Sequence, residues 1–335
     1  MRKITTIITI IIILLSTMTV YTQSQAQEIQ PVNISDNLYA VTDLGGGNIA
    51  FLVTDEGIIV VDATYLPSVA RNLVSIIQKV SDKPIKYLIL THSHGDHING
   101  IAGFPDDVTI IAHKNLTANN MTFTEARTAN LAENVFPSYL ASLKTQMDST
   151  ADKNSEEYQA LEQSYNVNNE YFTGLKTIKF REPEITFDDN YELEFGGEKI
   201  ILKYPGAGHT NDNIIVKFPR HNAIHTGDLI FNGAVPYVIV EHGANTHSWV
   251  KILDQLYSEN YEYVIPGHGE LANKEIFKVQ AEYFTKLIHK VQILKNEGLS
   301  LEEIKNKIDI AEFNLTRSAD QFPINIEVIY TELVN

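Results

Sequence analysis

The chain of 335 residues contains no cysteine. Its absence excludes disulfide bonds, so the fold must be held together by its packed core alone. It also excludes thiolate ligands, so a metal site here has to be built from histidine, carboxylate, carbonyl oxygen or water. With 44% hydrophobic residues, the chain is long enough for one large domain or for one domain with an insertion.

Positive charge is scarce. The sequence has 26 lysines and arginines against 42 aspartates and glutamates, which gives a formal net charge of −16. An acidic surface of this kind argues against nucleic-acid binding and against docking on anionic lipid. The composition therefore predicts neither a nucleic-acid nor a membrane partner, and it leaves the oligomeric state open.

The first 26 residues differ in composition from the rest. Arg2 and Lys3 precede an almost unbroken apolar run over residues 7–20, and residues 24–26 (Ser-Gln-Ala) are small enough for a cleavage site. A run of about 14 apolar residues is too short to cross a bilayer well, since roughly 20 are needed. We interpret residues 1–26 as a signal peptide of a secreted or periplasmic protein. Cleavage after Ala26 removes two positive charges and changes the net charge from −16 to −18.

Two stretches of the chain share one pattern of short apolar strands followed by a helix and a buried strand. The predicted strands are 48–53, 57–62, 85–91, 199–204, 213–218, 223–225 and 263–265, and the predicted helices are 67–80 and 246–258. Alternation of this kind predicts an α/β layered fold. Polar clusters follow several of the strands, where open α/β sheets place their sites.

A different kind of segment, roughly residues 118–175, lies between the two stretches. Few glycines and a recurrent apolar spacing predict two or three inserted helices. They form either a surface excursion or a lid over the site, and in the lid Phe136, Tyr139 and Tyr171 would be the residues to examine. Further helices are predicted over about 274–335, one of them capped by Ser300 with Glu303 in the capping-box position.

The sequence His-Ser-His-Gly-Asp-His occupies residues 92–97. Residues i and i+2 of an extended segment point the same way, so His92 and His94 can bind one metal ion. Gly95 permits a tight turn, which brings Asp96 and His97 towards a second metal ion at the start of the next helix. A polar loop without a ligand has no need of this arrangement.

This hexapeptide resembles the H-x-H-x-D-H signature of the metallo-β-lactamase fold, a family of dinuclear zinc hydrolases. Gly-Ala-Gly-His-Thr (206–210), Thr-Gly-Asp (226–228) and Pro-Gly-His-Gly (266–269) follow in the family's order, and the resemblance covers residues 34–270. It implies an α/β fold, namely an αββα four-layer sandwich of two similar halves. Here the sandwich would occupy residues 27–335, with the helical insertion between its halves.

The resemblance also implies a ligand set. His92, His94 and His209 would hold one zinc ion, Asp96, His97 and His268 the other, and Asp228 would bridge them. A metal-bound hydroxide near Asp96 would attack a carbonyl carbon while the zinc ions polarise its oxygen. Iron or manganese would suit the same ligands. Asp62 matches a family aspartate that could orient a ligand, or it is a helix cap or turn residue.

The substrate is less well defined by the resemblance. The segment Gly-His-Thr-Asn-Asp-Asn (208–213) is similar to that of β-lactamases with a cysteine ligand, but this chain has Asp228 at the position of the cysteine. Phe231 stands where those enzymes have a lysine that binds the antibiotic's carboxylate. Both departures weigh against a dedicated β-lactamase.

The family's remaining reactions set the range of candidates. We expect hydrolysis of an ester, lactone, thioester or amide, with β-lactam as the leading named substrate. The alternative is an iron-containing oxidoreductase of the sulfur dioxygenase kind. Phe231, Tyr237 and His242 are predicted to line the substrate pocket, and the turn of residues 45–47 is either a flap or a plain hairpin turn.

Overall fold

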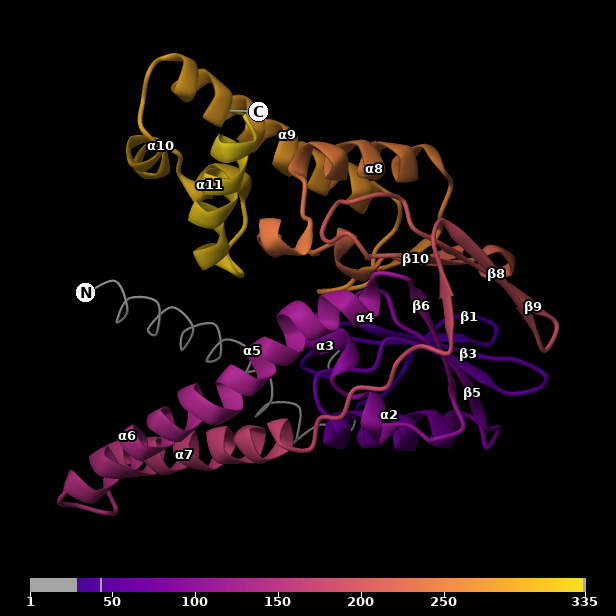
Figure 1. Cartoon of the computed structure of the whole chain (residues 1–335), viewed down its shortest axis with the longest axis horizontal. Helices are drawn as coiled ribbons and strands as arrows, with labels where there is room; N and C mark the ends of the chain where they lie inside the picture. The colour runs from indigo at the N-terminus through magenta and orange to yellow at the C-terminus, as the bar shows by residue number, and fades with distance from the viewer. Residues whose placement is uncertain (1–28, 43, 334–335) are drawn as a thin grey trace.

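The computed structural model describes residues 29–42 and 44–333, so the predicted signal peptide lies outside the described residues. Its centre is a pair of β-sheets (Figure 1). The first has the order β1 (Val32–Ser35), β2 (Leu38–Val41), β3 (Ile49–Val53), β4 (Ile58–Val61), β5 (Ile85–Ile89), β6 (Thr109–His113), β7 (Ile185–Phe187). The second has the order β12 (Tyr263–Ile265), β11 (Ala223–His225), β10 (Ile215–Phe218), β9 (Glu198–Lys203), β8 (Asn190–Phe195).

Three separate hydrophobic cores show that these sheets are the middle layers of a four-layer sandwich. Strand β4 is buried on both faces: Ile59 and Val61 belong to the core between the sheets, whereas Ile58 and Val60 pack into the core under helix α2 (Pro67–Val80). Such continuous burial is expected of a sheet that is covered on both sides. The αββα class predicted from the sequence is confirmed.

The third core lies between the second sheet and the C-terminal helices. Trp249 of α8 (Thr246–Ser258) and Phe284 of α9 (Glu275–Asn296) are fully buried there. Helices α10 (Leu301–Lys307) and α11 (Phe322–Glu332) complete this layer, and the predicted capping box of Ser300 and Glu303 is present. None of the helices in the described part of the chain is both long and apolar enough to cross a membrane.

The inserted segment forms an arm that projects from the sandwich (Figure 1). Its elements are α4 (Leu116–Asn119), the π-helical η2 (Asn120–Thr124), α5 (Glu125–Asn130), the π-helical η3 (Leu131–Val135), α6 (Phe136–Ser149) and α7 (Glu156–Leu175). Helices α6 and α7 pack on each other, and Phe136 at the base of the arm is buried in the first core. Much of the arm is therefore exposed, while its base is attached to the sandwich.

The strand ends place the polar motifs at one edge of the two sheets. Strands β4 and β5 are parallel and lead to Asp62 and to the loop that begins at Thr91. Strands β11 and β12 are also parallel and lead to residues 226–228 and 266–269. Since the carboxyl ends of parallel strands meet at one edge, the fold brings these segments together.

Candidate metal centre

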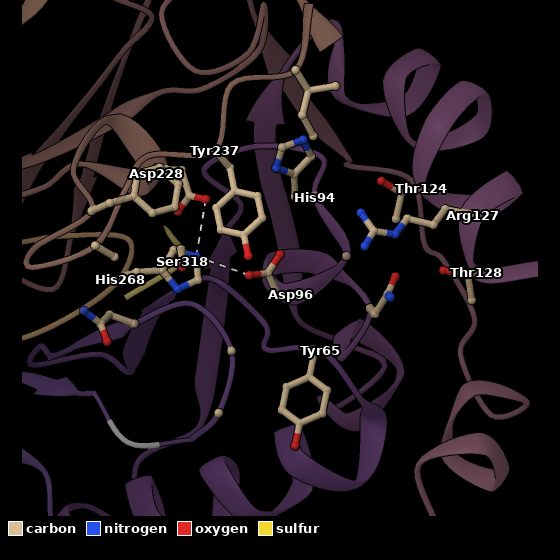
Figure 2. A pocket seen from close by; sticks show the side chains of 18 of the residues that line it. Tyr65, His94, Asp96, Thr124, Arg127, Thr128, Asp228, Tyr237, His268 and Ser318 are labelled. Carbon is tan, nitrogen blue, oxygen red and sulfur yellow. Dashed lines mark ion pairs between the residues drawn. The ribbon is translucent and has the colours of Figure 1, made fainter. Parts of the chain in front are cut away.

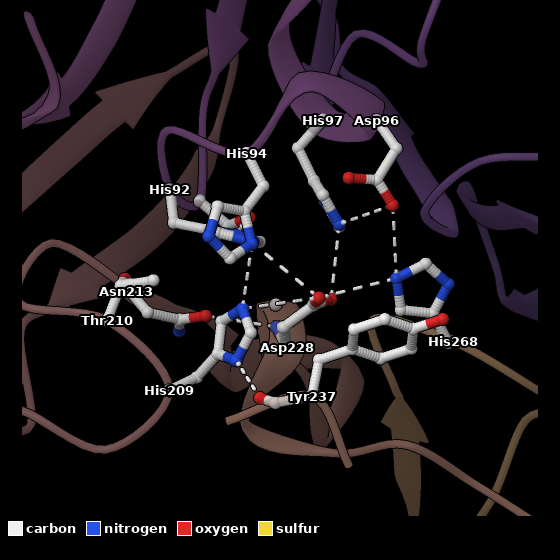
Figure 3. Close-up of polar contacts among 12 residues, drawn as sticks. His92, His94, Asp96, His97, His209, Thr210, Asn213, Asp228, Tyr237 and His268 are labelled. Atoms are coloured by element: carbon white, nitrogen blue, oxygen red, sulfur yellow. Dashed lines mark hydrogen bonds and ion pairs between the residues drawn. The ribbon is translucent and has the colours of Figure 1, made fainter. Parts of the chain in front are cut away.

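Seven side chains converge in two groups at this edge of the sheets (Figure 3). The loop after β5 and helix α3 (Gly95–Ile98) contribute the motif of residues 92–97, and the loops before β10, after β11 and after β12 contribute the others. The potential ligand atoms of each group lie within 4.8 Å of one another. The first group is His92, His94, His209 and Asp228, and the second is Asp96, His97 and His268.

In the first group the free ring nitrogens face a common point. Nε2 of His209 lies 3.0 Å from Nδ1 of His94 and 3.4 Å from Oδ2 of Asp228. Nε2 of His92 lies 3.7 Å from the same carboxylate oxygen. This Nε2 is buried and has no hydrogen-bond partner. A buried polar atom without a partner is costly, so the site fits a metal ion that would coordinate it.

Asp228 connects the first group with the second. Its Oδ1 lies 3.1 Å from Nε2 of His97, and its Oδ2 lies 3.3 Å from Nε2 of His268. Oδ2 of Asp96 lies 3.2 Å from Nε2 of His268 and 3.7 Å from Nε2 of His97. Asp228 therefore stands between the two groups, as a carboxylate that bridges two metal ions must.

The outer nitrogens of the first-group histidines are held by hydrogen bonds. Nδ1 of His209 donates to the carbonyl of Tyr237 at 3.0 Å, and Nδ1 of His92 lies 3.1 Å from Oγ1 of Thr91. Nε2 of His94 lies 2.6 Å from Nδ1 of His242. Such partners fix the ring and leave the other nitrogen free for a metal ion. His242, predicted to line the pocket, thus also contacts a candidate ligand.

Asp62 orients His97. It is fully buried, its Oδ2 accepts a hydrogen bond from Nδ1 of His97 at 2.7 Å, and both its oxygens bind Thr91. Its backbone has a φ of +70°, a left-handed conformation that costs free energy in a residue other than glycine. The N-cap of α2 is Leu66, so Asp62 does not cap this helix, and its carboxylate contacts the candidate ligand His97.

Two glycines let the backbone approach the ligands closely. A Cβ atom on Gly47 would lie 2.2 Å from the His97 ring, and one on Gly267 would lie 2.1 Å from Oδ1 of Asp228. Side chains cannot be accommodated at these distances. Gly47 belongs to the predicted turn of residues 45–47, and its N–H donates to the carbonyl of Asp96 at 3.3 Å. The turn therefore packs against the second group.

The electrostatics of the two groups differ. Burial and the neighbouring imidazoles lower the pKa of His92 and His94 well below the ordinary value. Burial also lowers the pKa of His209, to about 4, although Asp228 opposes this shift. Without a metal ion these three rings are therefore neutral at pH 7, which is the form that binds metal ions.

The second group is rich in paired charge. Burial lowers the pKa of His97 and His268, but carboxylates outweigh it: Asp228, Asp62 and Asp96 raise the pKa of His97, and Asp228 and Asp96 raise that of His268 to about 9. Burial conversely raises the pKa of Asp96 and Asp228, and the same two imidazoles hold both below the usual range. In the metal-free protein, the ionised carboxylate of Asp228 therefore lies beside the protonated rings of His97 and His268.

A cavity of about 1130 Å³ opens above the two groups. The three residues predicted for the substrate pocket, Phe231, Tyr237 and His242, all line it. Of the residues named for a lid, Tyr171 lines the cavity, Phe136 is buried in the core and Tyr139 contacts Ser164 within the arm. One of the three thus faces the site, together with Leu131 and Val167 of the same segment.

Sequence reasoning missed several residues of this cavity. Tyr65 and Arg127 line it, as do Arg317 and Ser318, which lie between the C-terminal helices. Arg127 is the only arginine in residues 118–175, a weak indication that was visible in the sequence. The other three carry no local motif, because only the folded chain brings them to the site.

Comparison with known proteins assigns this arrangement to a family. Residues 42–268 match the Metallo-beta-lactamase superfamily. The chain belongs to this superfamily. It is 22% identical over 271 residues to "Metallo-beta-lactamase type 2" of Bacillus sp. (strain 170), a match that covers 78% of this chain and 80% of that protein. The predicted family resemblance is confirmed.

Two solved structures share the fold. A metallo-beta-lactamase from Pontibacter korlensis has a TM-score of 0.53 at 17% identity and covers 77% of this chain and 99% of its own. A stereoselective inverting sec-alkylsulfatase from Pseudomonas sp. has a TM-score of 0.62 at 17% identity and covers 91% of this chain. The present chain spans about half, 50%, of that alkylsulfatase. With this family membership, the chain is a hydrolase that has a candidate site for metal ions.

Proposed function

We propose that this protein binds two zinc ions through the seven converging side chains and hydrolyses an ester, lactone, thioester or amide bond of a small molecule. The observation that carries the proposal is the position of Asp228 between two groups of histidine and carboxylate ligands beneath a cavity of about 1130 Å³. A large cavity above convergent polar groups is what a small-molecule active site requires.

The donor set favours this chemistry. Histidine and carboxylate suit zinc, and they suit iron or manganese as well. When bound, zinc supplies a Lewis acid and lowers the pKa of a coordinated water molecule to about 7. The residues of the chain hold this centre in place: Asp62 orients His97, and the carbonyl of Tyr237 orients His209.

Two side chains are placed to act on a substrate. The Asp96 side chain is 38% exposed and faces the cavity, so its carboxylate can accept a hydrogen bond from the attacking water and orient it. Burial raises the pKa of Tyr237, which keeps its phenol protonated and able to donate a hydrogen bond to a developing oxyanion. These positions support a role for Asp96 as a hydrogen-bond acceptor and for Tyr237 as a hydrogen-bond donor to an oxyanion, beside the candidate metal ligands.

β-Lactam is the leading named substrate, because the relatives of this chain include metallo-beta-lactamases. The matches cover about four fifths of each of these proteins. A sulfate ester is the second candidate. The alkylsulfatase structure covers 91% of this chain against 77% for the lactamase structure, so more of its elements have counterparts there. Phe231 stands at the cavity in place of the lactamase lysine and removes one reason to prefer β-lactams.

We further propose that the protein is exported and that residues 1–26 are removed. The basic start, the apolar run and the small residues at 24–26 support this proposal. Expression of the full chain in a Gram-negative host, followed by fractionation and N-terminal sequencing, tests it. A mature protein that begins near residue 27 in the periplasm is expected. An intact N-terminus in the cytosol would contradict it.

The central test combines metal analysis with a substrate panel. Purified protein is analysed for zinc, iron and manganese, and is then assayed with nitrocefin, a lactone, a thioester, an aryl ester and a sulfate ester. We expect close to two zinc ions per chain and turnover of at least one compound, lost on chelation and restored by zinc. Iron in place of zinc with no hydrolysis of any compound would contradict the proposal and support the oxidoreductase alternative.

A further inference from the structure

Arg127 is presented to the cavity by an irregular stretch of the inserted segment. It lies on α5, between the π-helical η2 and η3. Single turns of π-helix occur often at functional sites, because they change the direction in which neighbouring side chains point. Figure 2 shows the guanidinium of Arg127 extending from its helix towards the cavity that His94 and Asp96 also line.

The guanidinium has no partner in the described part of the chain. No ion pair or hydrogen bond engages it there, whereas Arg181 binds three backbone carbonyls and Arg220 pairs with Glu198. An arginine presents five N–H donors in a fixed fork that matches a carboxylate or a similar oxyanion. Those of Arg127 are all free to bind a molecule in the cavity.

The charge of Arg127 acts on a side chain that lines the cavity beside it. Burial raises the pKa of Tyr171 of α7 to about 12, and the Arg127 charge acts to lower it. The guanidinium is therefore close to the space that a substrate would fill.

The other lining residues suit an anion that carries an apolar part. Apart from the candidate metal ligands Asp96 and Asp228, Glu270 is the one carboxylate among the described residues that lines the cavity, against Arg127 and Arg317. Two divalent metal ions would add four positive charges, so the loaded cavity is positive although the whole chain carries −16. Apolar side chains of the inserted segment line the same cavity as Arg127, namely Leu131, Val167 and Leu175.

We infer that Arg127 binds an anionic group of the substrate that is not itself cleaved, a carboxylate or a sulfonate-like group, and that the apolar side chains of the inserted segment hold an adjoining hydrocarbon part. The inference rests on the proposed function, because it names the substrate class of the same site. It also explains why the position of Phe231 need not hold a lysine, because Arg127 of the inserted segment supplies the positive charge.

Binding measurements on the zinc-loaded protein test this without turnover. Isothermal titration calorimetry with octanoate, octanesulfonate and the neutral octanamide is done on the wild type, Arg127→Gln, Arg127→Lys and Arg71→Gln. Arg71 is an exposed arginine of α2 that does not line the cavity, so its variant is a matched control for the lost charge. Zinc content and circular dichroism are compared for all four proteins.

We expect Arg127→Gln to weaken the binding of at least one anion about tenfold, the effect of a lost charge-assisted hydrogen bond, with partial recovery in Arg127→Lys. Octanamide binding and the Arg71→Gln variant should match the wild type. Anion affinity should fall as salt is raised in the wild type and change little in Arg127→Gln. A response to octanoate alone assigns a carboxylate, and a response to octanesulfonate alone assigns a sulfonate-like group.

Unchanged anion binding in Arg127→Gln, or an equal loss for octanamide, would overturn the inference. The two proposals fail separately. If Arg127 is required for anion binding but no compound of the hydrolysis panel is turned over, only the proposed function fails. If a compound is hydrolysed and Arg127→Gln binds the anions normally, only the role of Arg127 fails.

Discussion

The floor beneath the cavity differs from the wall formed by the inserted segment. The floor is defined as the seven candidate ligands, of which His94, Asp96, Asp228 and His268 line the cavity, together with the residues that hold them. On the floor, Asp62, His92 and His97 are fully buried and lie at the ends of buried strands. In the wall, α7 has 20 residues, of which only Asn168 and Leu175 are buried. The packed sandwich therefore holds the candidate metal ligands in place. The wall, to which we assign substrate recognition, is mostly exposed.

The largest effect is expected on the floor, from Asp228→Ala. It removes the carboxylate shared by both groups and leaves the buried rings of His92 and His97 without it. Mutation of a residue that only orients a metal ligand typically lowers metal affinity or activity about 10–100-fold. Loss of the candidate ligand Asp228 itself should therefore lower activity more than about 100-fold and reduce the metal content. Elemental analysis and the substrate panel measure both. Retention of two metal ions with normal turnover would show that Asp228 does not bridge them.

Asp62→Asn should have the next largest effect. The amide retains the shape of the side chain but loses the negative charge that holds Nδ1 of His97 at 2.7 Å. We expect metal affinity at the second group to fall about 10–100-fold. A competition titration with a zinc chelator measures it. Because Thr91 connects Asp62 with His92, a smaller loss is also expected at the first group. An equal loss at both groups would contradict a specific role in orienting His97, and circular dichroism shows whether general unfolding is the cause.

The same contrast explains what could be predicted from the sequence. The two halves and the polar motifs at the strand ends could be predicted because strand periodicity and short motifs are local. The four layers and the clustering of the seven candidate ligands were implied by the family resemblance. Strands β1, β2, β6, β7 and β8 were not predicted, since they are short or lack a clear alternation. Arg127 and Ser318 reach the cavity only through tertiary packing, and no local pattern indicates which side of a helix or loop will face a site.

The two ligand groups should differ in how pH affects metal binding. In the metal-free protein, carboxylates outweigh burial and raise the pKa of His268 to about 9 and that of His97 well above the ordinary value. Zinc must displace these protons, so affinity at the second group should fall about tenfold per pH unit for each proton as pH drops below the pKa. His209, with a pKa of about 4, holds no proton at neutral pH, so the first group should respond little.

Zinc competition titrations at about pH 6, 7 and 8 measure this difference, as does proton release monitored with an indicator dye. The second zinc equivalent to bind should release more protons than the first. The Asp62→Asn variant offers a check, because loss of one of the carboxylates that raise the pKa of His97 should reduce the release. Equal release by both equivalents would contradict the assignment of separate protonation states to the two groups.

The smallest effect is expected where the wall meets the floor, from Asn119→Ala. Nδ2 of Asn119 donates to Oδ1 of Asn211 at 2.6 Å, and Oγ1 of Thr124 donates to the carbonyl of Ser93 at 2.5 Å, so the base of the insertion is bonded to both ligand loops. Loss of one such bond should cost about 1 kcal/mol of unfolding free energy. Denaturant titration measures it. Asn134→Ala is the control, because Asn134 is exposed and its side chain donates to Asn130 within the inserted segment.

If wall and floor are separable, Asn119→Ala should retain both metal ions and change the panel's relative rates by a few-fold, while Asn134→Ala changes neither. A loss of zinc in Asn119→Ala would show that the insertion holds the loop of His209 in place and belongs to the metal centre. The wall would then contribute to the chemistry as well as to recognition, and the Arg127 variants would need the same zinc analysis before any change in anion binding is assigned to the guanidinium.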